Sequence, residues 1–374
     1  MTSRISVLTT LFNHEGFIKD TLQSALIQTL APSEIVVLDD ASTDNSLKAA
    51  RSVSHPVIQV LSEKYNLGGP NTTKGLAACK GDLIAILNSD DVWAPEKLEK
   101  QFSHLTSSPQ TGVVFTHIRT IDEYGVQWTG NSHRHQHVFD VQNRSRFEWL
   151  KHFFLVGNPF CASSALIRKE CFDSLGLLDG SYIQLQDLDM WVRVAIAGYD
   201  LHIVEEPLTY YRVMKDGSNM SSGLSGTRAT NSFEYAKTLR NFWRLTSLQE
   251  LIRIFPELNV ADRADDSLTL FYLAQYAAKQ PSLHHRLFAL ETMSKWGGDR
   301  EAMSLAYECH GFDFSQYRNF FARGPIRSLL RLSIRHQMNS LAMKILPYAV
   351  YEKVKTQVMA RRQSRTREIG PCDE

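Results

Sequence analysis

Two pairs of adjacent aspartates are the residues of this chain best suited to chemistry. The pair Asp39-Asp40 follows one β-branched apolar run, and the pair Asp90-Asp91 follows another. Neighbouring carboxylates repel each other, so a chain that holds them beside apolar residues normally offsets the repulsion with a cation, a metal ion or a hydrogen-bond donor on a ligand. Capping of the following helix is the alternative for either pair taken alone. If both pairs lie on one edge of a sheet, a ligand site is favoured.

The segments around these pairs predict the elements that hold them. Over the first ~120 residues, short β-branched runs alternate with segments of helical period, as in sheets built from βαβ units. Strands are expected at 5–9, 34–38, 57–61, 83–87 and 112–116, and helices at 15–29, 43–53, 71–80 and 95–106. This order predicts an α/β fold with a mostly parallel, Rossmann-like sheet flanked by helices. Ligands of such open sheets bind beyond the carboxyl ends of the strands, where both aspartate pairs lie.

Later segments complete this picture. Residues 160–168 predict one more strand, and residues 186–197 carry apolar side chains at helical spacing. Asp187 is therefore expected at the start of a helix. From residue 225 onward only helix-period segments follow, so we expect a larger domain at 1–224 and a helical C-terminal region at 225–374.

The C-terminal tail is basic. After Gly324-Pro325, arginines recur every four residues beside leucines and isoleucine, and few acids follow. One interpretation is a basic amphipathic helix on an anionic membrane surface. The other is a solvated helical face, and the sequence leaves both open.

The composition excludes several classes of protein. A 43% apolar and 22% charged chain of 374 residues can form a globular core, and its formal net charge of +1 gives no general attraction to nucleic acid. The five cysteines lack CxxC spacing, which predicts free thiols in a reducing, cytoplasmic setting rather than disulfides or a thiolate zinc site. Neither a signal peptide nor an apolar stretch of the ~18 to 20 residues needed for a membrane span is expected.

Four ordered segments resemble a known family. They are 5–13, 36–44, 81–95, and 186–191 followed by Tyr210-Tyr-Arg212. In their order and spacing the chain resembles the family 2 inverting glycosyltransferases, which have the nucleotide-diphospho-sugar transferase (GT-A) fold. The resemblance covers about residues 3–220. It implies a nucleotide-sugar-binding half at 1–118, an acceptor half at 119–224, and a C-terminal helical extension.

The resemblance implies roles for the residues at the strand ends. Asp40 would accept a hydrogen bond from the nucleotide base, and Thr10 and Phe12 would line the base and ribose. A carboxylate that reads a ring N–H makes a directional, charge-assisted contact, which suits uridine or thymidine. Asp90 would bind a divalent cation, Mn²⁺ or Mg²⁺, that bridges the diphosphate. Asp91 would orient Asp90 or the sugar.

Further donor contacts follow from the same resemblance. Asn88 and Ser89 complete the motif that ends at Asp90, and Asn88 replaces the first acid of the usual DxD. Lys74 and Arg212 would share the diphosphate charge. Many relatives carry a metal-reaching His where this chain has Met214, a poor ligand for a hard cation.

The resemblance also places a general base. In the family the base is the Asp of an acidic doublet at a helix start, and that position reads Gln186-Asp187 here. Direct displacement with inversion needs one carboxylate to take the proton of the acceptor hydroxyl, a contribution of ~10²–10⁴-fold. Asp187 is thus the expected base. Asp189 would point to a different side of the helix.

The implied activity is transfer of a sugar from a nucleotide-diphospho-sugar, with UDP-sugars favoured, to a hydroxyl of a glycan or lipid-linked acceptor. Cell-surface polysaccharide or lipopolysaccharide biosynthesis is the expected setting, at the inner face of the membrane if the basic tail binds lipid. A nucleotide-sugar-binding protein without turnover is the alternative, because Asn88 and Met214 remove two metal ligands. A nucleotidyltransferase is disfavoured, because residues 10–16 do not form a Gly-rich basic loop.

Overall fold

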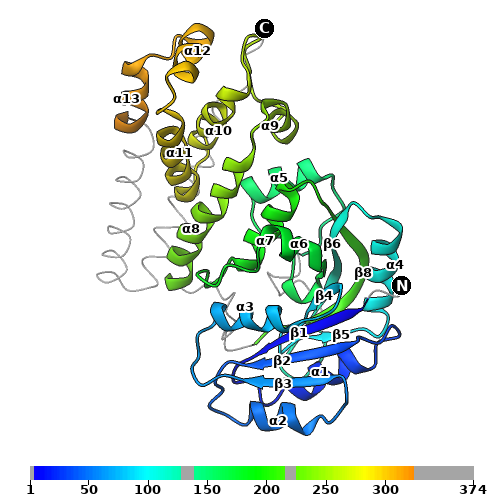
Figure 1. Cartoon of the computed structure of the whole chain (residues 1–374). Helices are drawn as coiled ribbons and strands as arrows, with labels where there is room; N and C mark the ends of the chain where they lie inside the picture. Colours follow the sequence, from blue (N-terminus) through cyan, green and yellow to red (C-terminus); the bar gives the residue numbers. More distant parts are fainter. Residues whose placement is uncertain (1–3, 128–138, 215–224, 324–374) are drawn as a thin grey trace, which may run out of the picture. The chain divides into compact units, whose positions relative to one another are not determined.

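The computed structural model describes residues 4–127, 139–214 and 225–323 (Figure 1). The chain divides into two compact units, residues 1–273 and 274–374. The first unit contains the whole sheet and every candidate site residue. The functional division expected at residue 224 stays a prediction.

A single mixed sheet organises the first unit. Its eight strands run in the order β3-β2-β1-β4-β7-β6-β8-β5 within the described residues. Their bounds are β1 (Ile5–Leu11), β2 (Glu34–Asp39), β3 (Ile58–Ser62), β4 (Leu83–Ile86), β5 (Val92–Trp93), β6 (Thr111–Ile121), β7 (Leu166–Arg168) and β8 (Asp200–Arg212). The first four strands pair in parallel, β6 and β8 also pair in parallel, and β7 and β5 pair antiparallel with their neighbours. The α/β fold class and the five N-terminal strands predicted from the sequence are confirmed.

Helices flank this sheet. In the first unit they are α1 (Ile18–Leu26), α2 (Ser46–Ser52), α3 (Gly69–Ala78), α4 (Lys97–Ser107), α5 (Arg146–Leu155), α6 (Lys169–Leu175), α7 (Gln186–Ile196), α8 (Ser225–Leu239) and α9 (Leu248–Ile254), with short 3₁₀ turns η2 (Ala162–Ser164), η3 (Arg240–Arg244) and η4 (Asp266–Leu268). The helix α10 (Thr269–Ala278) crosses the unit boundary, and α11 (Leu283–Trp296), α12 (Arg300–His310) and α13 (Phe314–Arg323) follow. Residues 324–374, which include the basic tail, lie outside the described part of the chain.

The main core lies between the parallel strands and the helices α1, α2 and α4. Fully buried side chains from the strands, such as Val7 and Val37, pack with Leu22 of α1 and Leu98 of α4. Burying each such side chain contributes roughly 1.5–3 kcal/mol. This packing fixes the strand ends, where the candidate site residues lie.

One predicted strand is only partly observed. Residues 160–168 were expected to be extended, but residues 162–164 form η2 and the strand is Leu166–Arg168. Ser164 turns the chain, because both its amide and its hydroxyl donate to the Cys161 carbonyl, at 2.9 and 2.7 Å. Serine side chains compete with strand pairing in this way.

The strand register brings the two aspartate pairs to the same end of the sheet, where the parallel strands finish. Leu11, at the end of β1, pairs with Asp39, at the end of β2. On the other side of β1, the Leu87 amide donates to the Leu8 carbonyl at 2.9 Å just after β4 ends. Both pairs therefore lie at the carboxyl ends of β2 and β4, the two parallel strands that flank β1, as expected. Every helix in the described part of the chain is too short or too polar to span a lipid bilayer.

Candidate active site

Asp91 anchors the loop between β4 and β5. Its side chain is completely buried; Oδ1 accepts from the Arg212 amide at 2.9 Å, and Oδ2 accepts from the Ser163 hydroxyl at 2.5 Å. Asn88 adds a longer contact of 3.4 Å from its side-chain nitrogen. Burial, followed by the charge of Asp90, raises the pKa of the Asp91 carboxyl to about 8. Asp91 therefore ties the loop to β8 and to the segment around η2.

Asp90 is the more accessible carboxylate of the pair. It is only partly buried, and this burial raises its pKa, while the nearby His14 and Arg212 act in the opposite direction. The Arg212 side chain donates through Nε to the Asp90 carbonyl at 2.7 Å and through a terminal nitrogen to the Asp122 carbonyl at 2.9 Å. Arg212 thus fixes the backbone of Asp90 and lies close enough to act on its carboxylate.

His14 was not identified from the sequence, yet it lies next to this motif. Its Nδ1 is 2.8 Å from the Ser89 hydroxyl, and its backbone amide donates to the Ser46 hydroxyl at 2.7 Å. Ser89 is buried, and its carbonyl accepts from Thr21 at 3.1 Å. The only feature of the sequence that could have indicated His14 as a site residue was its position just after the first strand.

Asp40 contacts its own chain. Its carboxylate accepts from the amides of Leu67 and Gly68 at 2.9 and 2.8 Å, and from the side chain of Asn71. Since Gly68 precedes α3 and provides no side-chain cap, Asp40 supplies the acceptor that the start of α3 lacks. Asp40 is therefore placed at the expected edge and stabilises the segment 67–71.

Asp39 differs from Asp40 in how its oxygens are used. It is 2% exposed; Oδ2 accepts from the Ser42 amide at 3.3 Å, whereas Oδ1 is buried and has no hydrogen-bond partner among the described residues. Leaving a buried acceptor without a donor costs about 1–3 kcal/mol. Asp39 Oδ1 is thus an acceptor at the strand edge that a ligand could satisfy.

The remaining donor-side residues lie at the same edge with different exposure. Thr10 lies within β1, and Phe12 follows that strand with 41% of its surface exposed. Lys74 is on α3, largely exposed, and forms an ion pair of 2.7 Å with Glu63. Lys74 is therefore occupied by a surface partner.

Asp187 occupies the first turn of α7, as predicted. Its Oδ1 accepts from the Leu188 amide and its Oδ2 from the side-chain amide of Asn158, both at 2.7 Å. Burial raises the pKa of the Asp187 carboxyl to about 6, against the opposing effect of these hydrogen bonds. The carboxylate is therefore fixed in orientation and more basic than an ordinary aspartate.

One short segment links Asp187 with the aspartate pair. Asn158 binds Asp187, and Ser163, five residues later, binds Asp91. Between them, the buried thiol of Cys161 has its pKa raised by burial first and also by the charges of Asp91, Asp187 and Asp90. All three carboxylates therefore lie within electrostatic range of one atom, so the structure brings Asp187 into the same region as Asp90 and Asp91.

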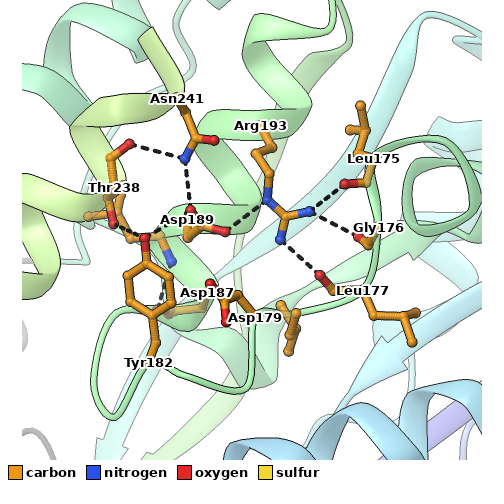
Figure 2. A network of polar contacts seen from close by, with 12 residues as sticks. Leu175, Gly176, Leu177, Asp179, Tyr182, Asp187, Asp189, Arg193, Thr238 and Asn241 are labelled. Atoms are coloured by element: carbon orange, nitrogen blue, oxygen red, sulfur yellow. Dashed lines mark hydrogen bonds and ion pairs between the residues drawn. The ribbon is translucent and has the colours of Figure 1, made fainter. Parts of the chain in front are cut away.

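Asp189 has a different environment from Asp187. It is buried and forms an ion pair of 2.8 Å with Arg193, and it accepts from Tyr182 at 3.1 Å and from Asn241 at 2.7 Å (Figure 2). The Arg193 guanidinium also donates to the carbonyls of residues 175–177. This network fixes α7 against its neighbours.

A carboxylate from α8 holds the turn before α7. Glu234 is 3% exposed and accepts from three successive amides, those of Ile183, Gln184 and Leu185, at 2.6, 2.8 and 2.9 Å. Because Leu185 itself provides no side-chain cap, Glu234 acts as the cap of α7 from outside the helix. The position of Asp187 thus depends on a residue that follows it by 47 positions in the sequence, from 187 to 234.

Comparison with known proteins decides the family. The model described as "Glycosyl transferase family 2" matches residues 6–176. Residues 6–176 belong to glycosyl transferase family 2. This match includes both aspartate pairs and Asn158 and ends before Asp187.

Similar proteins agree with this assignment. The glycosyltransferase is 27% identical over 246 residues to an uncharacterised glycosyltransferase of Methanocaldococcus jannaschii, covering 64% of this chain and 79% of that protein. It is 28% identical over 224 residues to the amylovoran biosynthesis glycosyltransferase AmsE of Erwinia amylovora, covering 58% of this chain and 79% of that one.

A solved structure supports the fold. The mannosyltransferase PcManGT from Pyrobaculum calidifontis, in complex with GDP-Man and Mn²⁺, superposes with a TM-score of 0.51 at 17% identity, covering 90% of this chain and 87% of that one. At this identity the likeness concerns the GT-A fold alone, which agrees with the sheet and flanking helices of the glycosyltransferase.

Proposed function

We propose that this glycosyltransferase moves a sugar from a nucleotide-diphospho-sugar, with UDP-sugars favoured, to a hydroxyl of a glycan or lipid-linked acceptor, with inversion at the anomeric carbon. The single observation that carries the proposal is the connection of Asp187, through Asn158 and Ser163, to the Asp90-Asp91 loop. It supports a base and a diphosphate-binding edge within one site.

Asp187 is the proposed general base. With a pKa of about 6, its carboxyl is mostly ionised at neutral pH and is still basic enough to accept a proton in the transition state. In the proposed step the acceptor hydroxyl oxygen attacks the anomeric carbon, its proton passes to Asp187, and the bond between sugar and diphosphate breaks. The nucleoside diphosphate leaves with the electron pair of that bond.

The nucleotide base is proposed to bind beyond β1 and β2. Phe12 offers an exposed aromatic face for the base or ribose, with Thr10 beside it in the sequence. Asp40 is the proposed acceptor for the base N–H from the family resemblance. The buried Oδ1 of Asp39 is a second candidate for this contact, because it has no donor among the described residues, whereas Asp40 already accepts three hydrogen bonds.

The protein side chains at this site can hold a divalent cation only together with phosphate oxygens of the nucleotide-sugar. Asp90 supplies one partly exposed carboxylate, and no group of three potential ligands occurs within the described part of the chain. Mg²⁺ and Mn²⁺ are often held by one or two carboxylates together with substrate phosphates, so Asp90 is the residue that would hold the ion. When bound, the cation would neutralise charge on the diphosphate. The Mn²⁺ bound with GDP-Man in PcManGT supports this proposal.

The other motif residues are proposed to shape this edge. Ser89 positions the loop through its contact with His14, and Asn88 does so through its contact with Asp91. Asp91 is the buried anchor of the loop that presents Asp90. Arg212 lies close enough to Asp90 to act on the charge there. A role for Lys74 at the diphosphate requires that it leave Glu63, which is feasible for an exposed ion pair worth at most about 1 kcal/mol.

The setting is proposed to be the assembly of a cell-surface polysaccharide. AmsE, named for amylovoran biosynthesis, supports this class of product. The cytoplasmic location and the contact of the basic tail with a membrane stay predictions. Binding without turnover is the alternative, since the Asn88 side chain donates to Asp91 and provides no acid for a metal.

A donor panel tests the proposal. Thermal shifts with UDP-, GDP- and dTDP-sugars, with and without Mn²⁺, should show the largest stabilisation for one nucleotide, by mass action on the folded state. The preferred donor is then used in hydrolysis or transfer assays with wild type and Asp187→Asn. Tight donor binding with no turnover by the wild type across a broad acceptor panel would favour the binding protein instead.

A further inference from the structure

His14 has one ring nitrogen that the protein leaves without a partner. Its Nδ1 lies 2.8 Å from the Ser89 hydroxyl, whereas Nε2 forms no hydrogen bond within the described part of the chain. The side chain is half-buried, and Nε2 is not among the fully buried atoms that lack a partner, so it reaches the surface of the protein. This nitrogen can therefore contact a bound molecule.

The burial of Ser89 decides which ring nitrogen of His14 carries the hydrogen. Ser89 is 3% exposed, and its hydroxyl has no second hydrogen-bond partner among the described residues. If neutral His14 donated from Nδ1, the hydroxyl hydrogen of Ser89 would be buried without an acceptor, which is unfavourable. Neutral His14 therefore accepts at Nδ1 and carries its hydrogen on Nε2, and the imidazolium form carries one there too. A nitrogen that holds a hydrogen has no lone pair for a metal, so Nε2 is a hydrogen-bond donor.

Contacts between two loops fix the backbone of His14. The loop 13–15 follows β1, and the loop 42–46 follows β2, so both lie at the carboxyl end of the sheet. Backbone amides of each loop donate to side chains of the other: those of Asn13, His14 and Glu15 to Ser42, Ser46 and Asp44 at 3.1, 2.7 and 3.1 Å, and those of Thr43 and Asn45 to Asn13 and Glu15, both at 2.8 Å. The imidazole is thus held in place before a ligand arrives, which lowers the entropy cost of binding.

The imidazole of His14 lies beside Asp90, the carboxylate proposed to hold the cation. Ser89, which Nδ1 contacts, directly precedes Asp90 in the chain. Of the two cationic side chains that oppose the raised pKa of the Asp90 carboxyl, His14 has the larger effect and Arg212 the smaller. Phe17 contacts both: its ring lies 5.8 Å from the ring of His14 and 4.7 Å from the guanidinium carbon of Arg212. An anion bound at Asp90 through a cation would consequently lie close to His14.

We propose that His14 binds the diphosphate of the nucleotide-sugar through Nε2. The inference rests on the proposed function for the place of the diphosphate at Asp90, whereas the free donor rests on the contacts of His14 itself. A hydrogen bond from an N–H group to an anionic phosphate oxygen is charge-assisted and directional. Since the described residues gather no set of three potential metal ligands, a donor beside the cation offsets diphosphate charge that the cation leaves.

A purely structural role for His14 is the alternative, in which its contact with Ser89 only fixes the loop before Asp90. Either role would weaken diphosphate binding when His14 is replaced, so Ser89 is varied as well. The variants are His14→Phe, which keeps an aromatic ring without an N–H, Ser89→Ala, which breaks the contact, and the double variant. His55→Phe is the matched control, because His55 is exposed and precedes β3 at the opposite end of the sheet.

Calorimetry measures the affinity of the full chain for UDP and for uridine, with and without Mn²⁺. His14→Phe should weaken UDP binding by about tenfold or more, as expected for the loss of a charge-assisted hydrogen bond, and leave uridine binding unchanged. It should still cost about tenfold in the Ser89→Ala background, where the loop contact is already absent. His14→Gln, which keeps an N–H donor, should recover part of the affinity, and His55→Phe should bind UDP like the wild type. His14→Ala provides the same comparison if the phenylalanine variant does not fold.

Three results would overturn the role of His14 and leave the proposed function intact. They are equal UDP affinity in wild type and His14→Phe, equal losses for UDP and uridine, and an effect of His14→Phe that disappears in the Ser89→Ala background. The last result would mean that His14 acts only through the loop. If wild type binds none of UDP, GDP and dTDP, the proposed function fails together with this inference.

Discussion

The side-chain amide of Asn158 donates a hydrogen bond of 2.7 Å to the carboxylate of Asp187. The same asparagine accepts from the Phe160 amide at 3.1 Å through its Oδ1, so its amide group has a defined orientation. The orientation of the Asp187 carboxylate therefore depends on a loop residue as well as on its own helix. A base held in this way loses little entropy when the acceptor arrives.

Asn158→Ala should move the acidic limb of the rate profile to higher pH. The hydrogen bond favours the charged carboxylate, so its loss raises the pKa of Asp187 above the present value of about 6. We expect the limb to move by about one pH unit, because a hydrogen bond to a partly exposed carboxylate is worth about 1.4 kcal/mol, which corresponds to one unit of pKa. The pH dependence of kcat measures the shift. Asn241→Ala, which removes the matching contact to Asp189, should leave the limb unmoved.

Asp187→Asn should abolish most of the transfer and spare donor binding. The asparagine keeps the shape of the side chain but cannot take the acceptor proton, so kcat should fall by roughly 10²–10⁴-fold. In the wild type, transfer should decline below about pH 6 as the carboxyl is protonated. Single-turnover rates and donor affinity are measured together. Unchanged turnover in the variant would remove Asp187 from the mechanism.

Glu234→Ala should lower both stability and kcat. The change leaves three amides of the turn before α7 without their acceptor, and each hydrogen bond to a charged group is worth about 1.5–3 kcal/mol. We expect a loss of at least about 2 kcal/mol in urea unfolding, and Glu234→Gln should recover part of it. Glu206→Gln, which removes an exposed ion pair with Lys100, should cost less than about 1 kcal/mol. If Glu234→Ala were equally mild, Glu234 would not be the cap of α7.

Asp39→Asn and Asp40→Ala should separate binding from stability. Asp40 accepts three hydrogen bonds from 67–71, so its removal should destabilise the fold by about 2–3 kcal/mol. Asp39 has an unsatisfied oxygen, so Asp39→Asn should lower stability little while weakening UDP binding by about tenfold. Calorimetric titration with UDP and urea unfolding of both variants provide the comparison. The reverse pattern would assign the base contact to Asp40 alone.

Asp91 should make the fold less stable as the pH rises. Its pKa is about 8 in the folded chain, above the ordinary value near 4, so the folded state binds more protons than the unfolded state between these values. The unfolding free energy should therefore decrease as the pH rises from about 4 to about 8. Asp91→Asn should flatten part of this slope. An unchanged slope in the variant would mean that other groups cause it.

Local sequence patterns predicted the parts of the site that depend on strand ends and helix starts. The positions of Asp90, Asp91 and Asp187 followed from an apolar run and from helical spacing. Local sequence patterns could not predict the contacts of Asn158, Ser163 and Glu234, because each of these residues binds a residue between 29 and 72 positions away. The turn at η2 was missed because serine hydroxyls overrode a strand-like pattern.

The hydrogen bond between Asp91 and the Arg212 amide joins positions 121 residues apart. During synthesis at about 5–20 residues per second, Arg212 is added roughly 6–24 s after Asp91. Until then the nascent chain carries a carboxylate whose burial site does not yet exist. The loop that presents Asp90 can therefore close only late, so an unfinished chain should not bind its donor in the mature manner.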